Sequence, residues 1–305
     1  MVNPIFSWFL FAIIIFSLIV FDLGVLNKKD KVISFRESLI LSIFYILISC
    51  LFGVYVYIYL GSQSGKEYFT GFVLEKAMSL DNIFIISIIF KFFSIPLKYQ
   101  HRVLFWGIIG VIVLRAIMIM LGATLLMHFS WILYIFAIIL IITGVKTFCI
   151  SEHAVNIKEM YVYKILKKYC NIIPEIKDNS FFVTQDNKLF ITPLFMALVT
   201  VETMDLIFAI DSIPAIFAIT QDIYIVYTSN IFAILGLRAL FFCLANIVNK
   251  FRYVKYSLAI ILIVIGMKIF IHHFIAIPTY IPLVVTLLLL LLGILLSIII
   301  KPSEK

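Results

Sequence analysis

Nine apolar runs, each long enough to cross a lipid bilayer, follow one another along this chain of 305 residues. They lie at about 5–25, 38–60, 70–92, 103–127, 130–150, 192–219, 226–248, 254–271 and 280–300. A transmembrane helix needs about 20 mainly apolar residues. Within lipid, a helix is the structure that bonds every backbone group inside one segment. The pattern therefore predicts an all-α polytopic membrane protein with about nine transmembrane helices.

Composition agrees with a membrane protein and argues against a soluble domain. The chain is 64% hydrophobic and only 13% charged. Its net charge of +8 would suit a nucleic-acid-binding protein, but the basic residues lie between the apolar runs. We therefore expect the lipid bilayer as a partner and no nucleic acid.

The basic residues also predict the orientation. Of the 24 lysines and arginines, 18 fall on one side of the predicted membrane and Lys66 alone falls on the other, while five lie within or at the ends of spans. Lysine and arginine accumulate in cytoplasmic loops. The asymmetry places the N-terminus outside, the C-terminus in the cytoplasm, and the basic segment 151–191 on the cytoplasmic side.

Two parts of the chain repeat one pattern. Glu75 and Asp81 are six residues apart, as are Asp205 and Asp211, and Arg115 and Arg238 each follow in the next apolar run. The two copies start on opposite sides of the membrane, which is typical of an inverted-topology repeat. The predicted organisation is 1–69 (two N-terminal helices), 70–150 (first three-helix repeat), 151–191 (cytoplasmic basic connector), 192–271 (second three-helix repeat) and 272–305 (last helix and cytoplasmic tail).

Carboxylates inside these runs are the strongest functional signal. An ionised side chain at the centre of a bilayer costs about 3 kcal/mol on insertion scales, so such residues commonly mark ion pathways. Six acids lie in the predicted membrane, against three basic residues available for charge pairing: Asp22, Glu75, Asp81, Glu202, Asp205 and Asp211, facing Lys76, Arg115 and Arg238. The excess of three carboxylates could bind a divalent cation or carry protons. The alternative is that the arginines neutralise acids for structure alone.

The residue types favour a hard or borderline divalent cation. Carboxylates, together with Asn82 and Ser212, offer oxygen ligands of the kind that Mg²⁺, Ca²⁺ and Mn²⁺ prefer. Met78 and Met204 lie beside the acids, where a thioether could favour Mn²⁺, although packing is the commoner role of methionine. Pro214 is expected to break its helix at 210–214 and free carbonyl oxygens. The sequence shows no nucleophile–base set and no phosphate-binding loop, so we expect no enzyme, no cofactor and no nucleotide.

At these residues the sequence resembles the TerC family of bacterial integral membrane proteins. The resemblance covers nearly the whole chain and is strongest in GFVLEKAMSLDN (71–82), YQHRVLFWG (99–107), ETMDLIFAIDSIPA (202–215) and SNIFAILGLR (229–238). Ala77 departs from the serine that is more usual in the family. The resemblance implies a multi-pass protein of the cell inner membrane that exports Mn²⁺. It also implies a metal path lined by Asp22, Glu75, Asp81, Asn82, Glu202, Asp205 and Asp211.

Two hypotheses remain open from the sequence. The first is a secondary transporter that exports a divalent metal cation, with Mn²⁺ as the transported ion, in exchange for protons. The alternative is a membrane scaffold subunit of a tellurium or metal stress-resistance complex. A transporter requires acids that meet at a hydrated cavity, whereas a scaffold pairs each acid with a base. The oligomeric state is not predicted by the sequence.

Overall fold

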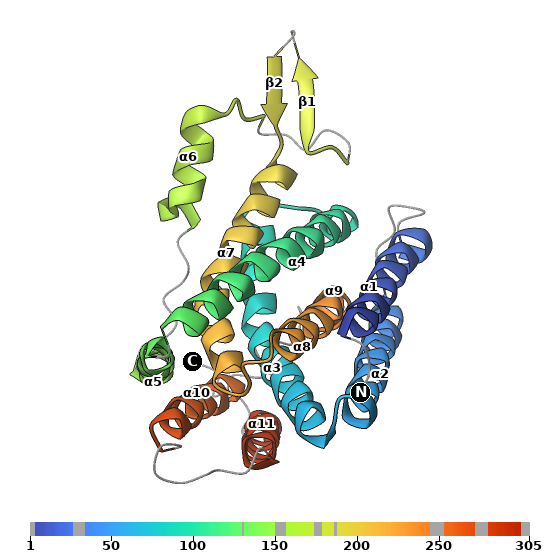
Figure 1. The fold of residues 1–305 in the computed structure, drawn as a ribbon. Helices are drawn as coiled ribbons and strands as arrows, with labels where there is room; N and C mark the ends of the chain where they lie inside the picture. The colour runs from blue at the N-terminus through green and yellow to red at the C-terminus, as the bar shows by residue number, and fades with distance from the viewer. Residues whose placement is uncertain are drawn as a thin grey trace.

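The computed structural model describes residues 4–26, 34–129, 131–149, 157–173, 179–185, 188–244, 253–271 and 280–299. Helices dominate them (Figure 1). The elements are α1 (Pro4–Leu26), α2 (Phe35–Tyr59), α3 (Ser62–Phe92), α4 (Leu97–His128), α5 (Ile132–Cys149), the 3₁₀ turn η1 (Ile157–Glu159), α6 (Tyr161–Tyr169), β1 (Phe182–Gln185), β2 (Lys188–Ile191), α7 (Pro193–Phe217), α8 (Ile223–Leu235), α9 (Leu237–Leu244), α10 (Val254–Ile271) and α11 (Tyr280–Ile299).

Each of the nine predicted runs coincides with a helix, and the run 226–248 coincides with two, α8 and α9. Seven segments of the described chain are long and apolar enough to cross a membrane. Helices α8 and α9 together form one of these segments, Ile223–Leu244. Helix α5 is apolar but shorter. Helix α3, with 31 residues, is also long enough to cross a membrane, but it is not among the seven apolar segments and carries the charged residues Glu75, Lys76 and Asp81. The protein is therefore a mainly helical, multi-pass membrane protein.

The outer surface of the bundle is apolar. Large hydrophobic side chains on the outer helices are well exposed, for example Phe16 at 69% and Ile299 at 73%. A soluble protein rarely exposes such continuous apolar area. These side chains are suited to contact with lipid.

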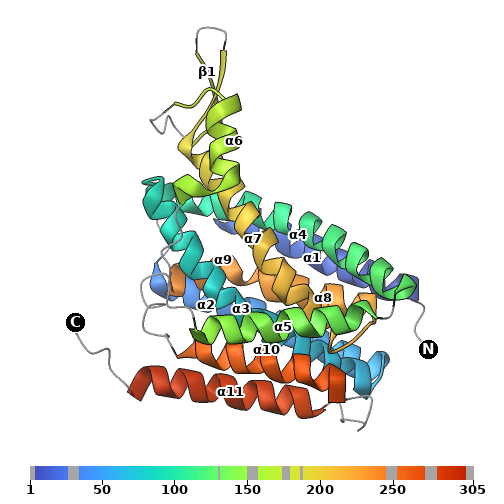
Figure 2. The same ribbon diagram turned by 90° about the vertical axis from the view of Figure 1, so that its left-hand side faces the viewer.

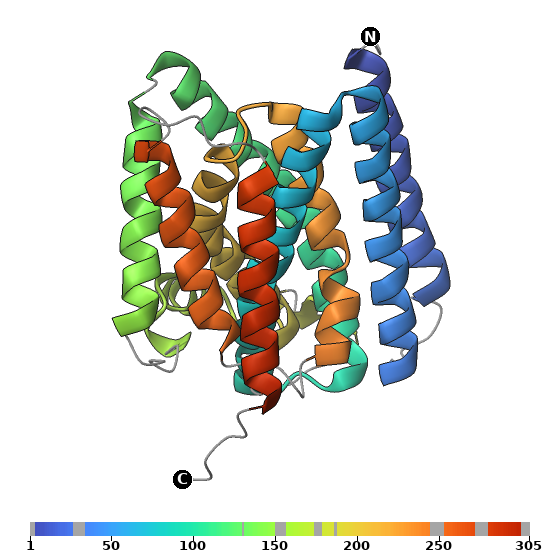
Figure 3. The same ribbon diagram turned by 90° about the horizontal axis from the view of Figure 1, so that it is seen from below.

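The long helices form a central group with other helices packed around it. Helices α3, α4, α7, α8 and α9 lie in the middle, α1 and α2 flank them on one side, α5 and α10 lie on the other, and α11 lies in front of the group, against α10 and α3 (Figure 3). Within the central group, α3 packs on α8 and α4 packs on α7; at its side, α5 packs on α10. The centre therefore brings α3 and α4 together with α7 and α8, from distant parts of the sequence.

The connector contains structure that the sequence analysis did not predict. Strands β1 and β2 form an antiparallel hairpin that pairs Phe182 with Ile191. Helix α6 and this hairpin project to one side of the bundle (Figure 2). The segment 61–69, expected as a loop, is helical from Ser62 onward, because α3 begins directly after Gly61. Gly61 has φ of 108°, a conformation that glycine adopts at little cost.

Glycines allow α5 and α10 to approach closely. A Cβ at Gly144 would lie 2.6 Å from Ile263 Cγ1 and 2.7 Å from the Ala259 carbonyl oxygen. On the facing helix, a Cβ at Gly266 would lie 2.8 Å from the Ala137 carbonyl oxygen. Small residues commonly permit this packing between membrane helices. The contact holds α5 against α10, next to the polar centre described below.

We predict that Gly144→Val separates α5 from α10. Overpacking of this kind typically destabilises a protein by about 1–3 kcal/mol. The purified variant should therefore melt at a lower temperature in detergent than the wild type. Ile142→Val, at an exposed position of the same helix, is the matched control and should melt like the wild type. Equal melting of all three proteins would contradict the close contact.

Candidate functional site

Arg115 of α4 is the centre of a buried polar cluster. Its side chain is 1% exposed. Its Nη1 donates to Glu75 Oε1 of α3 at 2.7 Å, to Ser212 Oγ of α7 at 2.8 Å and to Asn230 Oδ1 of α8 at 3.2 Å. Its Nε and Nη2 donate to the two carboxylate oxygens of Asp205 on α7, at 3.3 and 3.4 Å. We call these five residues the Arg115 cluster.

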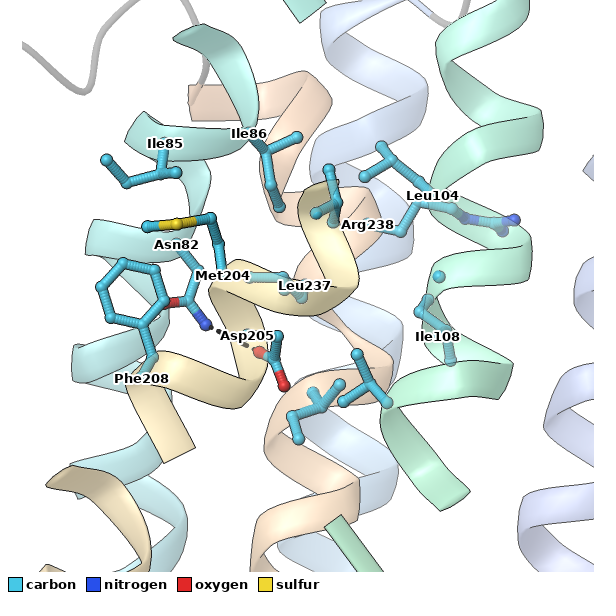
Figure 4. Close-up of a pocket in the computed structure, with 14 residues that line it drawn as sticks. Asn82, Ile85, Ile86, Leu104, Ile108, Met204, Asp205, Phe208, Leu237 and Arg238 are labelled. Carbon is cyan, nitrogen blue, oxygen red and sulfur yellow. Dashed lines mark hydrogen bonds between the residues drawn. The ribbon is translucent and has the colours of Figure 1, made fainter. Parts of the chain in front are cut away.

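Two asparagines complete the bonding of the carboxylates. Asn230 Nδ2 donates to Glu75 Oε2 at 3.1 Å. Asn82 Nδ2 of α3 donates to Asp205 Oδ1 at 3.2 Å, the dashed line in Figure 4. All four oxygens of Glu75 and Asp205 thus accept hydrogen bonds. A buried ion pair is tolerated when its remaining lone pairs are bonded in this way.

A polar cavity adjoins the cluster, and we call it the acidic cavity. It has a volume of about 150 Å³. It is lined by Glu75, Met78, Asp81, Asn82, Arg115, Thr143, Thr147, Phe208, Asp211, Ser212, Leu258, Ala259 and Leu262. A water molecule takes about 30 Å³ in the liquid, so several could fit. When all its groups are ionised, the lining carries three carboxylates and one guanidinium, which leaves two negative charges.

Asp81 and Asp211 occupy equivalent positions in the two sequence copies, and both line the acidic cavity. Asp81 is exposed and Asp211 is half-buried. Asp211 Oδ1 accepts a hydrogen bond at 2.9 Å from the hydroxyl of Thr143 on α5. Thr143 and Thr147 were missed by the sequence analysis. Their i, i+4 spacing places them on one face of a mainly apolar helix, and this pattern could have indicated them.

A second, smaller cavity lies on the other side of Asn82 and Asp205. Its volume is about 30 Å³ and its lining is almost wholly apolar, with side chains such as Ile86, Leu104 and Phe208. Arg238 reaches its edge but extends away from Asp205 and Asn82 (Figure 4). This cavity has little room or polarity for an ion.

Asp22 lies apart from the acidic cavity. It forms a buried salt bridge with Arg238 of α9 and accepts a hydrogen bond from the hydroxyl of Tyr45 at 3.2 Å. Asp22 is 6% exposed. The family resemblance placed Asp22 on the metal path, whereas in this conformation its contacts are those of an ion pair. The pair joins α1 to α9 and α2.

Lys76 was expected to pair with an acid, but it bonds to a backbone carbonyl. Its Nζ donates to the Ala233 carbonyl oxygen at 3.0 Å. That carbonyl lies in the last turn of α8, just before the interruption at Gly236. A Cβ at Gly236 would lie 2.7 Å from Lys76 Nζ. A cation at the C-terminus of a helix binds freed carbonyls and complements the helix dipole.

The expected helix break at Pro214 is wrong. Helix α7 continues through Pro214 and ends at Phe217, and the Pro214 carbonyl accepts a bond from Ala218 N at 2.9 Å. Proline has no N–H to donate to the Ile210 carbonyl oxygen, yet the helical backbone continues for three more residues. The interruption occurs instead between α8 and α9, at Gly236.

Glu202 lies outside both cavities. Both of its carboxylate oxygens are buried and have no hydrogen-bond partner among the described residues. They lie against α4, where a Cβ at Gly110 would come within 2.7 Å of each. The predicted ligands are therefore distributed over several places: Asp22 with Arg238, Glu202 at the glycines of α4, and the other five at the Arg115 cluster and acidic cavity. In the described part of the chain, no three His, Cys, Asp or Glu side chains gather closely enough to form a metal site.

We predict that Asp22→Asn destabilises the protein, because it leaves Arg238 buried without its counter-charge. Breaking a buried pair in this way typically costs about 3–5 kcal/mol. Tyr45→Phe removes only a hydrogen bond to Asp22 and should cost about 1 kcal/mol. The measurement is thermal unfolding of the purified variants in detergent. An Asp22→Asn protein as stable as Tyr45→Phe would show that the pair is not structural.

Comparison with known proteins adds the family. Residues 60–305 match the model of the integral membrane protein TerC family. An uncharacterized membrane protein of Rickettsia bellii is 64% identical over 90% of this chain and 91% of its own length. A protein of Photorhabdus laumondii, named as a putative membrane-bound redox modulator Alx, is 41% identical over 89% of this chain and 88% of its own length. No solved structure matches the chain. The family resemblance noted from the sequence is confirmed, and the chain belongs to the TerC family of integral membrane proteins.

Proposed function

We propose that this protein is a secondary transporter that exports a divalent metal cation, with Mn²⁺ as the cargo, across the cytoplasmic (inner) membrane in exchange for protons. One observation carries the proposal: the acidic cavity combines three carboxylates with a single guanidinium among membrane helices. An excess of two negative charges matches the charge of a divalent cation. Uncompensated charge inside a membrane is costly unless a cargo neutralises it.

The chemistry of the cavity supports this cargo. Carboxylate, amide and hydroxyl oxygens line it, and Met78 adds one thioether. Oxygen ligands suit Mg²⁺, Ca²⁺ and Mn²⁺, while a thioether adds softness that Mn²⁺ accepts more readily than Ca²⁺. The choice of Mn²⁺ rests on this donor set and on the family resemblance.

We also propose nine spans with the N-terminus outside and the C-terminus in the cytoplasm. The start of α1 and the end of α11 lie at opposite ends of the bundle (Figure 3), as an odd number of crossings requires. The packing also supports an inverted repeat of 70–150 and 192–271. In the two copies, α3 corresponds to α7 and α4 corresponds to α8. The contact of α3 with α8 therefore corresponds to the contact of α7 with α4, and both contacts are present.

The scaffold hypothesis is favoured by the ion pairs. Arg115 binds Glu75 and Asp205, and Arg238 binds Asp22, as a purely structural role would require. Two acids argue against it. Glu202 has no hydrogen-bond partner in the described chain, and Asp211 lines a cavity where its recorded bond is to a hydroxyl group. A scaffold has no use for a buried carboxylate without a bonding partner, such as Glu202, or for one that lines a polar cavity, such as Asp211.

We predict that Asp81→Asn or Asp211→Asn abolishes Mn²⁺ efflux while the protein still folds and inserts. The substitution keeps the size of the side chain but removes the charge that compensates a cation for its lost hydration. The measurement is Mn²⁺ accumulation in cells that depend on this protein, alongside its abundance in the membrane.

Asp222→Asn is the matched control for the efflux measurement. Asp222 caps the N-terminus of α8 through bonds to Tyr224 N and Ile225 N, outside the acidic cavity, and asparagine is an equally good cap. Efflux should therefore remain normal. Normal efflux by both cavity variants would exclude these aspartates as ligands, and loss of the protein itself would favour the scaffold.

Orientation is tested by labelling single cysteines in intact cells with a membrane-impermeant maleimide. Gln63→Cys lies at the start of α3 and Tyr169→Cys at the end of α6, and both side chains are exposed. In a chain whose native cysteines are replaced, we expect labelling at 63 only. Labelling at both positions, or at 169 only, would contradict the proposed orientation.

A further inference from the structure

We propose that Arg115 is a tethered cation that occupies the oxygen atoms of the Arg115 cluster until a divalent cargo displaces it, and that this exchange rejects monovalent cations. The inference rests on the proposed function and deepens it. It assigns to Arg115 a role in selectivity, through the position of its guanidinium group.

Arg115 bonds to the same kinds of oxygen atom that would bind a metal ion. Three nitrogens reach five oxygens, on Glu75, Ser212, Asn230 and Asp205. Carboxylate, amide and hydroxyl oxygens are also the ligands of hard divalent cations. The guanidinium therefore holds the donors that a cargo entering the cluster would need.

The acidic cavity connects the cargo to these donors. Glu75, Asn82, Arg115 and Ser212 line the cavity and also take part in the cluster or its hydrogen bonds. Asn82 Oδ1 is buried without a hydrogen-bond partner in the described chain. The orientation of the Asn82 amide is set by its bond to Asp205: an ionised carboxylate can only accept, so Nδ2 faces Asp205 and Oδ1 points away from it. This oxygen is available to a cation at the boundary between cavity and cluster.

The bonds of Arg115 differ in length, which indicates where displacement begins. The bond to Glu75 is 2.7 Å long, whereas those to Asp205 are 3.3 and 3.4 Å. Short charge-assisted bonds are the stronger ones. Asp205 is therefore the carboxylate that the guanidinium releases first, and Glu75 keeps Arg115 on the cluster as the cargo enters.

Charge then decides which ions succeed. A guanidinium and a metal ion cannot share the same oxygens, because like charges repel strongly where the surroundings are poorly polarisable. A monovalent ion carries no more charge than the guanidinium and must replace five hydrogen bonds. A divalent ion brings twice the charge to the same carboxylates. Arg115 thus sets a charge threshold, and its return neutralises the carboxylates once the cargo has left.

The test is direct binding of ⁵⁴Mn²⁺ to the purified full chain in nanodiscs at fixed pH, with Na⁺ as a competitor. We expect Arg115→Gln to bind Mn²⁺ at least tenfold more tightly than the wild type. We also expect Na⁺ to displace Mn²⁺ from the variant at concentrations that leave the wild type unaffected. Unchanged or weaker binding by the variant would overturn the inference.

Lys76→Gln is the matched control. It also removes one positive charge from the membrane interior, but Lys76 binds a carbonyl oxygen, so no carboxylate is released. We expect its affinity for Mn²⁺ to change less than twofold. Equal tightening in Lys76→Gln and Arg115→Gln would overturn the inference in favour of a general electrostatic effect.

A second variant covers the case in which Arg115→Gln does not fold. Arg115→Lys keeps the charge with fewer donors, so it should bind Mn²⁺ more tightly than the wild type. Methylguanidinium should compete with Mn²⁺ in the Arg115 variants and not in the wild type, and its failure to compete would overturn the inference. Absence of Mn²⁺ binding in every form would overturn the proposed cargo itself.

Discussion

The contact of one arginine with two carboxylates holds the centre of this protein together. Arg115 comes from α4, Glu75 from α3 and Asp205 from α7, and Asn230 of α8 bonds to both Arg115 and Glu75. In lipid, packing between apolar helices gains little from the hydrophobic effect, so polar contacts contribute much of the specificity of assembly. The same contact requires these helices to meet at one depth, which places the acidic cavity beside it.

The two arginines of the sequence repeat have become different in their partners. Arg115 bonds to acids of both copies, Glu75 in the first and Asp205 in the second. Arg238 instead bonds to Asp22 of α1, which precedes both copies. The proposed inverted repeat therefore does not extend to the partners of its two arginines. One arginine lies beside the cavity, and the other fastens the central group to the flanking helices.

Much of the fold follows from hydrophobicity, because length and polarity alone determine which segments can cross a bilayer. The nine runs were predicted on that basis, and each coincides with a helix. Side-chain partners were harder to predict. The sequence shows that Lys76 and Asp22 lie in apolar runs, but their partners, the Ala233 carbonyl and Arg238, come from helices more than 150 residues away. Pro214 misled because a proline removes only one backbone hydrogen bond, and α7 stays helical through that position to Phe217.

The interruption at Gly236 separates two charge systems that are close in sequence. Asn230 lies on α8 and bonds to the Arg115 cluster, whereas Arg238 lies on α9 and bonds to Asp22. On a continuous helix these two residues would turn and shift as one rigid rod. The break places a joint between them, with the Lys76 ammonium seated on the carbonyl at its edge. Mechanically, Gly236 divides the part of this span that bonds to the cavity from the part that the Asp22 ion pair fastens to α1.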